Sequence, residues 1–264
     1  MRFHYLGTAS GVEPFPDMHH QSWVLEVNGI NYWFDAGENC VHRAHTSGID
    51  VMNTAAVFIS HPHPDHYCGL PNLFFCLQKI TVKFKKQMIK GKLQLFFSEP
   101  ALLQAMKSLI FRRKKPPFNP IEPAFTLEEC PMHDGLLYSD ENVTVSALHN
   151  RHMGEDGSEG WHSYSFLIEA EGKRIVFSGD VKSPEELDEL IGDGCDQLIM
   201  ETGHHVVEDV LNYALSRKVR RLRLTHHGRS ILENRPFYEA LAQKFSSENA
   251  IDVRLCYDGM TEEI

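Results

Sequence analysis

The sequence predicts an α/β fold from three observations. Short apolar runs of strand length, among them residues 55–59, alternate along the chain with segments whose apolar residues have helical spacing. Several of these runs lead directly into His or Asp side chains, as in α/β proteins whose sites lie at the carboxyl ends of strands. The 264 residues, 42% of them hydrophobic, can bury a large core, and no Pro/Gly/Ser-rich linker interrupts them. We therefore expect one large domain over residues 1–264.

The first half of the chain is expected to consist mainly of strands, with two helices. A strand pattern begins at residue 3, and a glycine-containing turn follows at 7–11. Asn28 and Gly29 are a type I′ turn pair between two apolar runs, which predicts a hairpin. The further elements expected here are strands over 24–27, 30–34, 55–59, 80–84 and 93–97, helices over 70–77 and 100–109, and a proline-rich surface crossing over 116–123.

The second half continues the alternation of strands, polar turns and helices. Ser183, Pro184 and Glu186 form a helix-start pattern, with an N-cap serine, proline at the first helical position and a glutamate placed for a capping box. The elements expected here are strands over 143–148, 165–170, 174–178, 197–200 and 221–225, helices over 206–217 and 236–245, and a Gly- and acid-rich loop over 153–160.

Residues 60–66 are the most informative stretch, because they contain three histidines and an aspartate. Imidazole and carboxylate groups are good zinc ligands, and ligands this close in sequence form a site at little loop-closure cost. His61 and His63 each precede a proline, which favours extended backbone and places both side chains on one side. Asp65 and His66 are then free to reach a second position. We expect a metal site here; a solvated His-rich loop is the alternative.

The charge distribution indicates which kinds of partner the protein can bind. A formal net charge of −10 argues against general nucleic-acid affinity. Two basic stretches depart from this trend: residues 79–92 contain six lysines and no acid, and residues 112–115 read Arg-Arg-Lys-Lys. Two interpretations stay open for them. They are solvated faces of a hairpin and a helix end, or they steer an anionic substrate.

Composition also indicates the compartment. The amino terminus lacks the apolar core of a signal peptide, and no apolar run approaches the length of a membrane span, so we expect no membrane partner. The six cysteines are scattered and form no C-x-x-C pair, which is typical of buried thiols in a reducing setting. We therefore expect a cytoplasmic protein.

The ordered polar motifs resemble the metal motifs of the metallo-β-lactamase superfamily. The matching residues are His61-x-His63-x-Asp65-His66, a downstream histidine, Ser178-Gly179-Asp180 and Thr225-His226. The stretches 6–11, 34–38 and 69–71 are similar to the ribonuclease Z-like branch, and the resemblance runs from residue 3 to about residue 230. It implies an αββα four-layer sandwich with two divalent metal ions at one edge. Zinc is the usual metal, and manganese or iron suits the same ligand types.

The resemblance, carried over position by position, also implies a ligand set. It comprises three histidines for one ion, an aspartate and two histidines for the other, and an aspartate bridging both: His61, His63 and His152; Asp65, His66 and His226; and Asp180. Two divalent ions about 3.5–4 Å apart can generate hydroxide near neutral pH and stabilise charge on a phosphoryl group. Asp65 could also orient the attacking water.

Several assignments have alternatives. His149 and His152 both follow the same predicted strand, and the family's Asn-x-His spacing favours His152 as the third ligand. Asp35 resembles an outer residue that orients a ligand histidine, or it only caps a turn. His204 resembles a residue that donates a proton to the leaving oxygen, or it is an ordinary loop residue. His227 does not match the ligand step, though it could contact substrate.

The chain departs from ribonuclease Z in two places. Those enzymes carry a long arm that grips transfer RNA between the third histidine and the bridging aspartate, whereas only 27 residues separate His152 and Asp180 here. The family's His-Ser-Thr segment before the last metal histidine is also missing. An armless member is similar to phosphodiesterases of small substrates, including the anti-Pycsar enzymes that degrade cyclic nucleotides.

We therefore expect a dinuclear-metal-dependent phosphodiesterase that hydrolyses a small phosphodiester, with a cyclic nucleotide favoured, through a metal-bound hydroxide. The partners expected are a small phosphodiester or nucleotide and no stable duplex nucleic acid, with a homodimer left open. Three alternatives remain: a ribonuclease Z-type RNA endonuclease, a thioester, lactone or β-lactam hydrolase of the same fold, and an inert metal-binding sensor.

Overall fold

The computed structural model describes residues 1–12, 15–156 and 160–264. Within these residues the chain forms two seven-stranded mixed sheets and one two-stranded ladder. The first sheet has, in spatial order, β16 (Thr261–Glu263), β1 (Arg2–Gly7), β2 (Ser22–Val27), β3 (Ile30–Phe34), β4 (Thr54–Phe58), β5 (Lys92–Phe96) and β6 (Thr126–Cys130). Its pairs from β3 to β6 are parallel, and the others are antiparallel. The β2–β3 turn has positive φ at Asn28 and Gly29, as type I′ geometry requires.

The second sheet is built in the same mixed way. It has, in spatial order, β15 (Asp252–Leu255), β14 (Arg221–His227), β13 (Gln197–Thr202), β12 (Lys173–Phe177), β11 (Tyr164–Ala170), β8 (Val143–His149) and β7 (Gly135–Ser139). The pairs from β12 to β15 are parallel, and those from β12 to β7 are antiparallel. The parallel strands of each sheet are joined through helices that cover its outer face, as crossover connections require.

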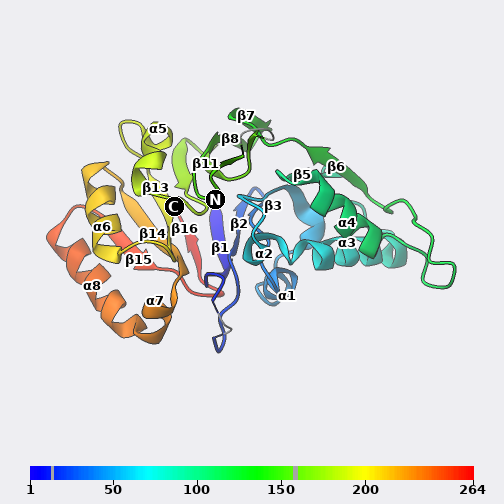
Figure 1. Cartoon of the computed structure of the whole chain (residues 1–264), viewed down its shortest axis with the longest axis horizontal. Helices are drawn as coiled ribbons and strands as arrows, with labels where there is room; N and C mark the ends of the chain where they lie inside the picture. Colours follow the sequence, from blue (N-terminus) through cyan, green and yellow to red (C-terminus); the bar gives the residue numbers. More distant parts are fainter. Residues whose placement is uncertain (13–14, 157–159) are drawn as a thin grey trace.

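The helices lie on the two outsides of the sheet pair. They are α1 (Cys40–Thr46), α2 (Pro64–Tyr67), α3 (Leu70–Phe84), α4 (Pro100–Ile110), α5 (Asp188–Ile191), α6 (Val207–Ser216), α7 (Arg229–Glu233) and α8 (Arg235–Glu248), with 3₁₀ turns η1 (Val51–Asn53) and η2 (Pro184–Leu187). Figure 1 shows α1–α4 beside the first sheet and α5–α8 beside the second, with both sheets between them. The predicted αββα sandwich is confirmed.

Three apolar clusters match the three spaces between the four layers. The central cluster lies between the sheets, where Trp23 meets Phe177 edge-on at 5.4 Å and Phe58 meets Phe166 at 6.0 Å between ring centroids. A second cluster joins the first sheet to α1, α3 and α4, and a third joins the second sheet to α5, α6 and α8. The three spaces between the layers are therefore filled mainly by apolar side chains.

Most elements expected from the sequence are present within a few residues of their predicted ends. The exceptions are informative. Residues 80–84 are not a strand, because α3 continues to Phe84. Its buried positions, Leu70, Leu73, Phe74 and Leu77, follow helical spacing, and the alternation at Val82 and Phe84 leaves both side chains more than half exposed.

Residues 153–160 were expected to be a loop, but they carry part of a short ladder between β9 (Glu155–Asp156) and β10 (Gly160–Trp161). The predicted loop also covered residues 157–159, which lie outside the described residues. The capping box at Ser183 is present, but it starts a 3₁₀ turn instead of a long helix. Elements α1, β6, β7, β15 and β16 had not been predicted. None of the helices that the structure describes combines the length and apolar character needed to cross a bilayer.

Candidate metal centre

The polar side chains that follow four separate strands converge at one edge of the sandwich. They come from residues 60–66 after β4, 150–152 after β8 and 178–180 after β12, and from His226, the next-to-last residue of β14. His63 has extended backbone and Pro64 occupies the first helical position, so α2 begins at once. This short helix carries Asp65 and His66 toward the ends of the second sheet.

A first group contains three histidines and one aspartate. His61 Nε2 lies 2.9 Å from His63 Nδ1, and His152 Nε2 lies 3.3 Å from the same atom. Asp180 Oδ2 lies 3.7 Å from both His61 Nε2 and His152 Nε2. One ligand atom from each of the four residues falls within 4.8 Å of all the others, so the group can hold a metal ion.

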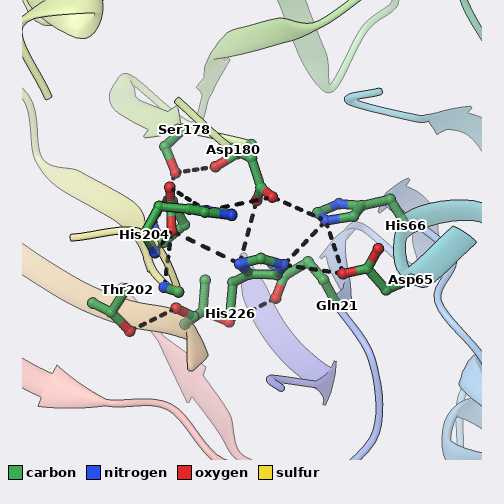
Figure 2. A network of polar contacts seen from close by, with 12 residues as sticks. Gln21, Asp65, His66, Ser178, Asp180, Thr202, His204 and His226 are labelled. Atoms are coloured by element: carbon green, nitrogen blue, oxygen red, sulfur yellow. Dashed lines mark hydrogen bonds and ion pairs between the residues drawn. The ribbon is translucent and has the colours of Figure 1, made fainter. Parts of the chain in front are cut away.

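A second group lies beside the first (Figure 2). His66 Nε2 and His226 Nε2 are 3.2 Å apart, and Asp65 Oδ2 lies 3.3 Å from the His226 nitrogen and 3.6 Å from the His66 nitrogen. Asp180 faces this group too, with Oδ2 at 3.6 Å from His66 Nε2 and Oδ1 at 3.3 Å from His226 Nδ1. Asp180 therefore stands between the two groups, at the position that the family resemblance implies for a bridging ligand.

The hydrogen bonding of the cluster is incomplete. Asp180 Oδ1 and His226 Nδ1 are buried and 3.3 Å apart without hydrogen-bond geometry between them, and neither has another hydrogen-bond partner among the described residues. Buried polar groups normally have such partners, and an unmatched one at a convergent cluster calls for an ion or water. Imidazole and carboxylate groups together suit zinc, iron or manganese. The donor set therefore fits divalent metal ions.

Burial and neighbouring charges set the protonation of the ligands. Burial, reinforced by the nearby imidazoles of His66 and His152, lowers the pKa of His61 well below its ordinary value and keeps a lone pair available. Burial also opposes charge on His226, but Asp180 and Asp65 raise its pKa to about 9. Ligand histidines must be neutral, so we expect metal binding to release a proton from His226.

An outer layer of hydrogen bonds orients the ligands. Asp35, buried with a left-handed backbone, accepts the Ser60 N–H at 2.7 Å, and its other oxygen lies 2.7 Å from His66 Nδ1. Ser60 Oγ lies 3.0 Å from His61 Nδ1. Both rings thus direct Nε2 toward the centre, and the predicted placement of Asp35 next to a cluster histidine is confirmed. Such partners fix ring orientation and tautomer in metal sites.

The two candidate histidines after β8 have different surroundings. His149 Nδ1 lies 2.7 Å from Asp134 Oδ2, and its ring stacks on Trp161 at 4.1 Å. His152 instead lies in the first group. The Asn150 side chain accepts the His152 N–H at 3.1 Å, which gives the Asn-x-His step a physical role in forming this turn.

Sequence reasoning gave no role to Glu201, which the structure places beside the cluster. Its buried carboxylate accepts the backbone N–H groups of Gly203 and His204, and Oε1 lies 3.1 Å from His204 Nδ1. Its Oε2 lies 3.8 Å from His226 Nδ1. The available signal was its position at the end of a buried strand, which is the signal that identified the other site residues.

His204 is half-exposed and lies at the rim, with Nδ1 3.8 Å from Asp180 Oδ2. The bond to Glu201 raises its pKa above the ordinary value. The idea that His227 contacts substrate is wrong. Its ring is fully buried, with Nδ1 2.9 Å from Thr202 Oγ1 and Nε2 3.0 Å from the Cys256 carbonyl, and it faces away from the cluster.

An open cleft of about 430 Å³ lies beside the cluster. His152 and His204 line it from the metal side, and Arg151, Lys182 and Met153 line it from the outside. The Arg151 guanidinium pairs with Glu186, whereas Lys182 is exposed. The cleft has room for a small molecule and presents positive charge beside the cluster.

Comparisons with known proteins agree with this geometry. The family model described as "Anti-Pycsar protein Apyc1" matches residues 1–244. Ribonuclease Z of Shouchella clausii is 26% identical over 279 aligned residues, covering 86% of each chain. Other matches are shorter: ribonuclease Z of Pyrococcus abyssi is 38% identical over 69 residues, which span 26% of this chain and 22% of that protein.

Solved structures show the same fold. The human short-form tRNase Z superposes with a TM-score of 0.71 at 20% identity, covering 100% of this chain and 99% of that one. The metallo-β-lactamase fold protein YhfI of Bacillus subtilis superposes with a TM-score of 0.72 at 15% identity, and covers 100% of this chain. With a family match over most of its length and the cluster described above, this chain belongs to the anti-Pycsar protein Apyc1 family and is a metal-dependent hydrolase of the metallo-β-lactamase fold.

Proposed function

We propose that the protein is a phosphodiesterase that hydrolyses a small phosphodiester, with a cyclic nucleotide as the preferred substrate. The observation that carries this proposal is the pair of ligand groups that Asp180 faces, beside a small cleft lined by Arg151 and Lys182. The family described as anti-Pycsar proteins, which we associate with cyclic-nucleotide degradation, supports the same substrate class.

We propose two divalent metal ions, zinc in the first instance, with manganese or iron as alternatives. His61, His63 and His152 would hold one, Asp65, His66 and His226 the other, and Asp180 both. When bound, such ions activate water near neutral pH and offset negative charge on a phosphoryl group. Metal analysis of the purified protein tests this directly, and a content of one ion or none per chain would contradict the dinuclear proposal.

The remaining steps belong to the chain's own residues. Asp65 has one oxygen facing the cluster and lies at its edge, so we propose that it orients the attacking water. His204 stands at the rim with a raised pKa and a fixed Glu201 partner, so we propose that it gives a proton to the leaving oxygen. Lys182 in the cleft would attract the phosphate.

Ribonuclease Z-type cleavage of RNA is the second candidate, because the curated relatives carry that name. Against it, the residues between His152 and Asp180 are occupied by the β9–β10 ladder and the β11–β12 hairpin, which leaves no room for a long arm. A polyanion of that size is normally held through many phosphate contacts, and the net charge here is −10. Hydrolysis of a thioester, lactone or β-lactam is a third candidate, and an inert metal-binding sensor a fourth.

The decisive experiment is a substrate panel with and without chelator. It contains 3′,5′- and 2′,3′-cyclic nucleotides, a linear dinucleotide, a transfer-RNA precursor, a thioester and nitrocefin. We expect chelator-sensitive turnover of the cyclic nucleotides and little of the rest. A preference for the precursor would favour the ribonuclease, turnover of thioester or nitrocefin alone would favour the other hydrolases, and no turnover at all would favour the sensor.

Three broader features remain proposals. We propose that residues 1–264 act as one domain, that the protein works in the cytoplasm, where its six free thiols would stay reduced, and that it forms a homodimer. Light scattering of the purified protein tests the dimer, because a monomer mass at micromolar concentration would contradict it.

A further inference from the structure

One carboxylate outside the ligand set joins two of the turns that carry the metal ligands. The turn over residues 150–152 follows β8 and contains His152, and the turn over residues 178–183 follows β12 and contains Asp180. Glu186 belongs to η2, and its side chain is only 7% exposed. Its carboxylate accepts hydrogen bonds from both turns. The sequence had predicted for it only the role of capping its own turn.

Each oxygen of this carboxylate serves one turn. Oε1 accepts the Arg151 backbone N–H at 3.0 Å and the Arg151 Nε–H at 2.9 Å. Oε2 accepts the Lys182 backbone N–H at 2.9 Å. Arg151 directly precedes His152, and Lys182 lies two residues after Asp180. The carboxylate therefore spans the two ligand turns.

Capping accounts for only the longest of the Glu186 contacts. In a capping box the glutamate accepts the N–H of the N-cap residue, which is Ser183 here. That contact measures 3.5 Å, whereas the bonds from Arg151 and Lys182 measure 2.9 or 3.0 Å. Burial alone would raise the pKa of Glu186, but the hydrogen bonds from Arg151 and from the backbone N–H groups lower it below its ordinary value. The carboxylate is therefore ionised at neutral pH, and its best bonds go to the ligand turns.

The topology of the second sheet explains why these turns need a link. β8 and β12 are not neighbours, because β11 lies between them and pairs antiparallel with both. Their ends therefore lie at the same edge of the sheet, about 9.5 Å apart. His152 Nε2 nevertheless lies 3.7 Å from Asp180 Oδ2. The two side chains meet only while both turns keep a fixed position over the end of β11.

Another link holds the bases of the same turns. Ser165 Oγ, in β11, accepts a hydrogen bond from Asn150 Nδ2 at 3.1 Å and donates to the Ser178 carbonyl at 2.6 Å. Asn150 and Ser178 both precede the ligands and lie next to the strand ends. Glu186 binds farther out along each turn. The sheet thus fixes where the turns begin, and Glu186 fixes where they lead.

We propose that Glu186 is a positioning residue of the metal centre, which holds His152 and Asp180 at the separation that an ion in the first group needs. The inference rests on the metal centre proposed above, and it adds a residue that neither the ligand set nor the expected mechanism contains. The second group should depend less on Glu186, because its other ligands come from α2 and β14: Asp65, His66 and His226.

The test is a chelator titration of the full-length, zinc-loaded protein, with the zinc retained per chain as the readout. Glu186→Gln should weaken the binding of the first-group ion by about 10- to 100-fold, as loss of an outer partner does in metal sites. The amide keeps one acceptor oxygen, but its NH₂ group would face the N–H donors of the other turn. The second-group ion should be retained at chelator concentrations that remove the first.

Three variants separate the bridge from other effects. Glu185→Gln is the matched control, because it removes the same charge from the adjacent, exposed residue of η2, and it should bind zinc as the wild type does. Arg151→Ala removes the ion pair but keeps the backbone N–H bond, so it should weaken zinc binding much less than Glu186→Gln. Glu186→Asp keeps the charge but is shorter by one methylene group, so it reaches one turn only and should resemble Glu186→Gln.

Several outcomes would overturn the inference. Wild-type zinc affinity in Glu186→Gln would do so even if the metal-free variant melted at a lower temperature, because Glu186 would then be a structural residue only. Equal weakening in Arg151→Ala would assign the effect to the ion pair, and full affinity in Glu186→Asp would assign it to charge. A wild-type protein that binds zinc but hydrolyses no phosphodiester would contradict the proposed function, while the zinc affinities would still decide the role of Glu186. A wild-type protein without affinity for zinc would overturn both.

Discussion

Two buried polar clusters link the two sheets of this protein, and they differ in how completely their groups are paired. At the metal centre, Asp180 Oδ1 and His226 Nδ1 have no hydrogen-bond partner within the part of the chain that the structure describes, and imidazole nitrogens face one another. The second cluster is centred on Arg223 of β14 and Glu262 of β16, and we call it the Arg223 cluster. Its guanidinium is fully buried and donates from all three nitrogens.

In the Arg223 cluster each buried charge has an oppositely charged partner. Arg223 Nε donates to the Glu262 carboxylate at 2.8 and 2.9 Å, and Nη2 donates to Asp252 Oδ2 at 2.7 Å. Tyr5 Oη, from the strand β1 that pairs with β16, donates to Glu262 at 3.1 Å. This difference in pairing distinguishes the functional cluster from the structural one. A cluster whose buried charges pair with one another stabilises the fold, whereas a cluster of converging imidazole nitrogens and carboxylates with unmatched atoms calls for an ion from outside.

The largest effect that tests this comparison is expected at the metal centre. Asp65→Ala should lower kcat/KM for bis(p-nitrophenyl) phosphate on the order of 10⁴-fold, as loss of one member of a catalytic unit does. The melting temperature of the metal-free protein should stay close to wild type, because Asp65 lies at the rim and joins no strands. Asp193→Ala, at an exposed carboxylate, is the control. Near-normal rates for Asp65→Ala would remove this residue from the mechanism.

The next effect is expected at the Arg223 cluster, on stability and not on chemistry. Glu262→Gln should lower the free energy of unfolding at pH 7 by about 3 kcal/mol, because it leaves Arg223 buried beside a neutral partner. Glu263→Gln, in the same strand but with an exposed side chain paired to Arg2, should cost less than about 1 kcal/mol. Denaturant unfolding measures both, and kcat should be unchanged in each. An equal loss of unfolding free energy in the two variants would mean that the buried ion pair stabilises the protein no more than the exposed one.

A smaller effect is expected from the outer layer of the metal centre. Asp35→Asn should weaken metal affinity by about 10- to 100-fold, because the amide cannot replace both of the carboxylate contacts to Ser60 and His66. Metal titration followed by the metal-dependent rise in melting temperature measures the loss without reference to activity. Asp50→Asn, at a carboxylate that caps η1 away from the site, is the control. An unchanged affinity in Asp35→Asn would reduce Asp35 to a turn cap.

The comparison also explains what could be predicted from the sequence. The first half of the metal centre is local: residues 60–66 carry four of its ligands, and prolines fix their backbone, so spacing alone identified them. Its second half comes from separate strand ends, and there the family resemblance was needed to choose His152 over His149. Glu201 was missed because its place at the end of a buried strand was its one signal, and that signal alone assigns no role.

The Arg223 cluster could not have been predicted at all. Its residues lie on β14 and on β16, a short edge strand with little apolar character that the sequence analysis did not predict. An arginine inside a strand is ordinarily a surface residue, and only the path of the last residues from one sheet to the other buries Arg223. Similarly, residues 80–84 were predicted as a strand from their alternating apolar residues, but they continue α3. The buried face of that helix decides their conformation, not the local alternation.

The smallest effect is the dependence of stability on pH that Glu262 of the Arg223 cluster contributes. Burial alone would raise the pKa of Glu262, but the hydrogen bonds and charge of Arg223 lower it below its ordinary value of 4.5. A carboxyl with a lowered folded-state pKa stabilises the protein above its unfolded pKa and loses that contribution as pH falls through the folded value. The gap in unfolding free energy between wild type and Glu262→Gln should therefore be constant from pH 7 to about 5 and then close, by at most about 1.4 kcal/mol per pH unit. A gap that stays constant to low pH would show that the glutamate acts through shape and hydrogen bonding alone, and the contrast between a charge-paired and an ion-requiring cluster would fail.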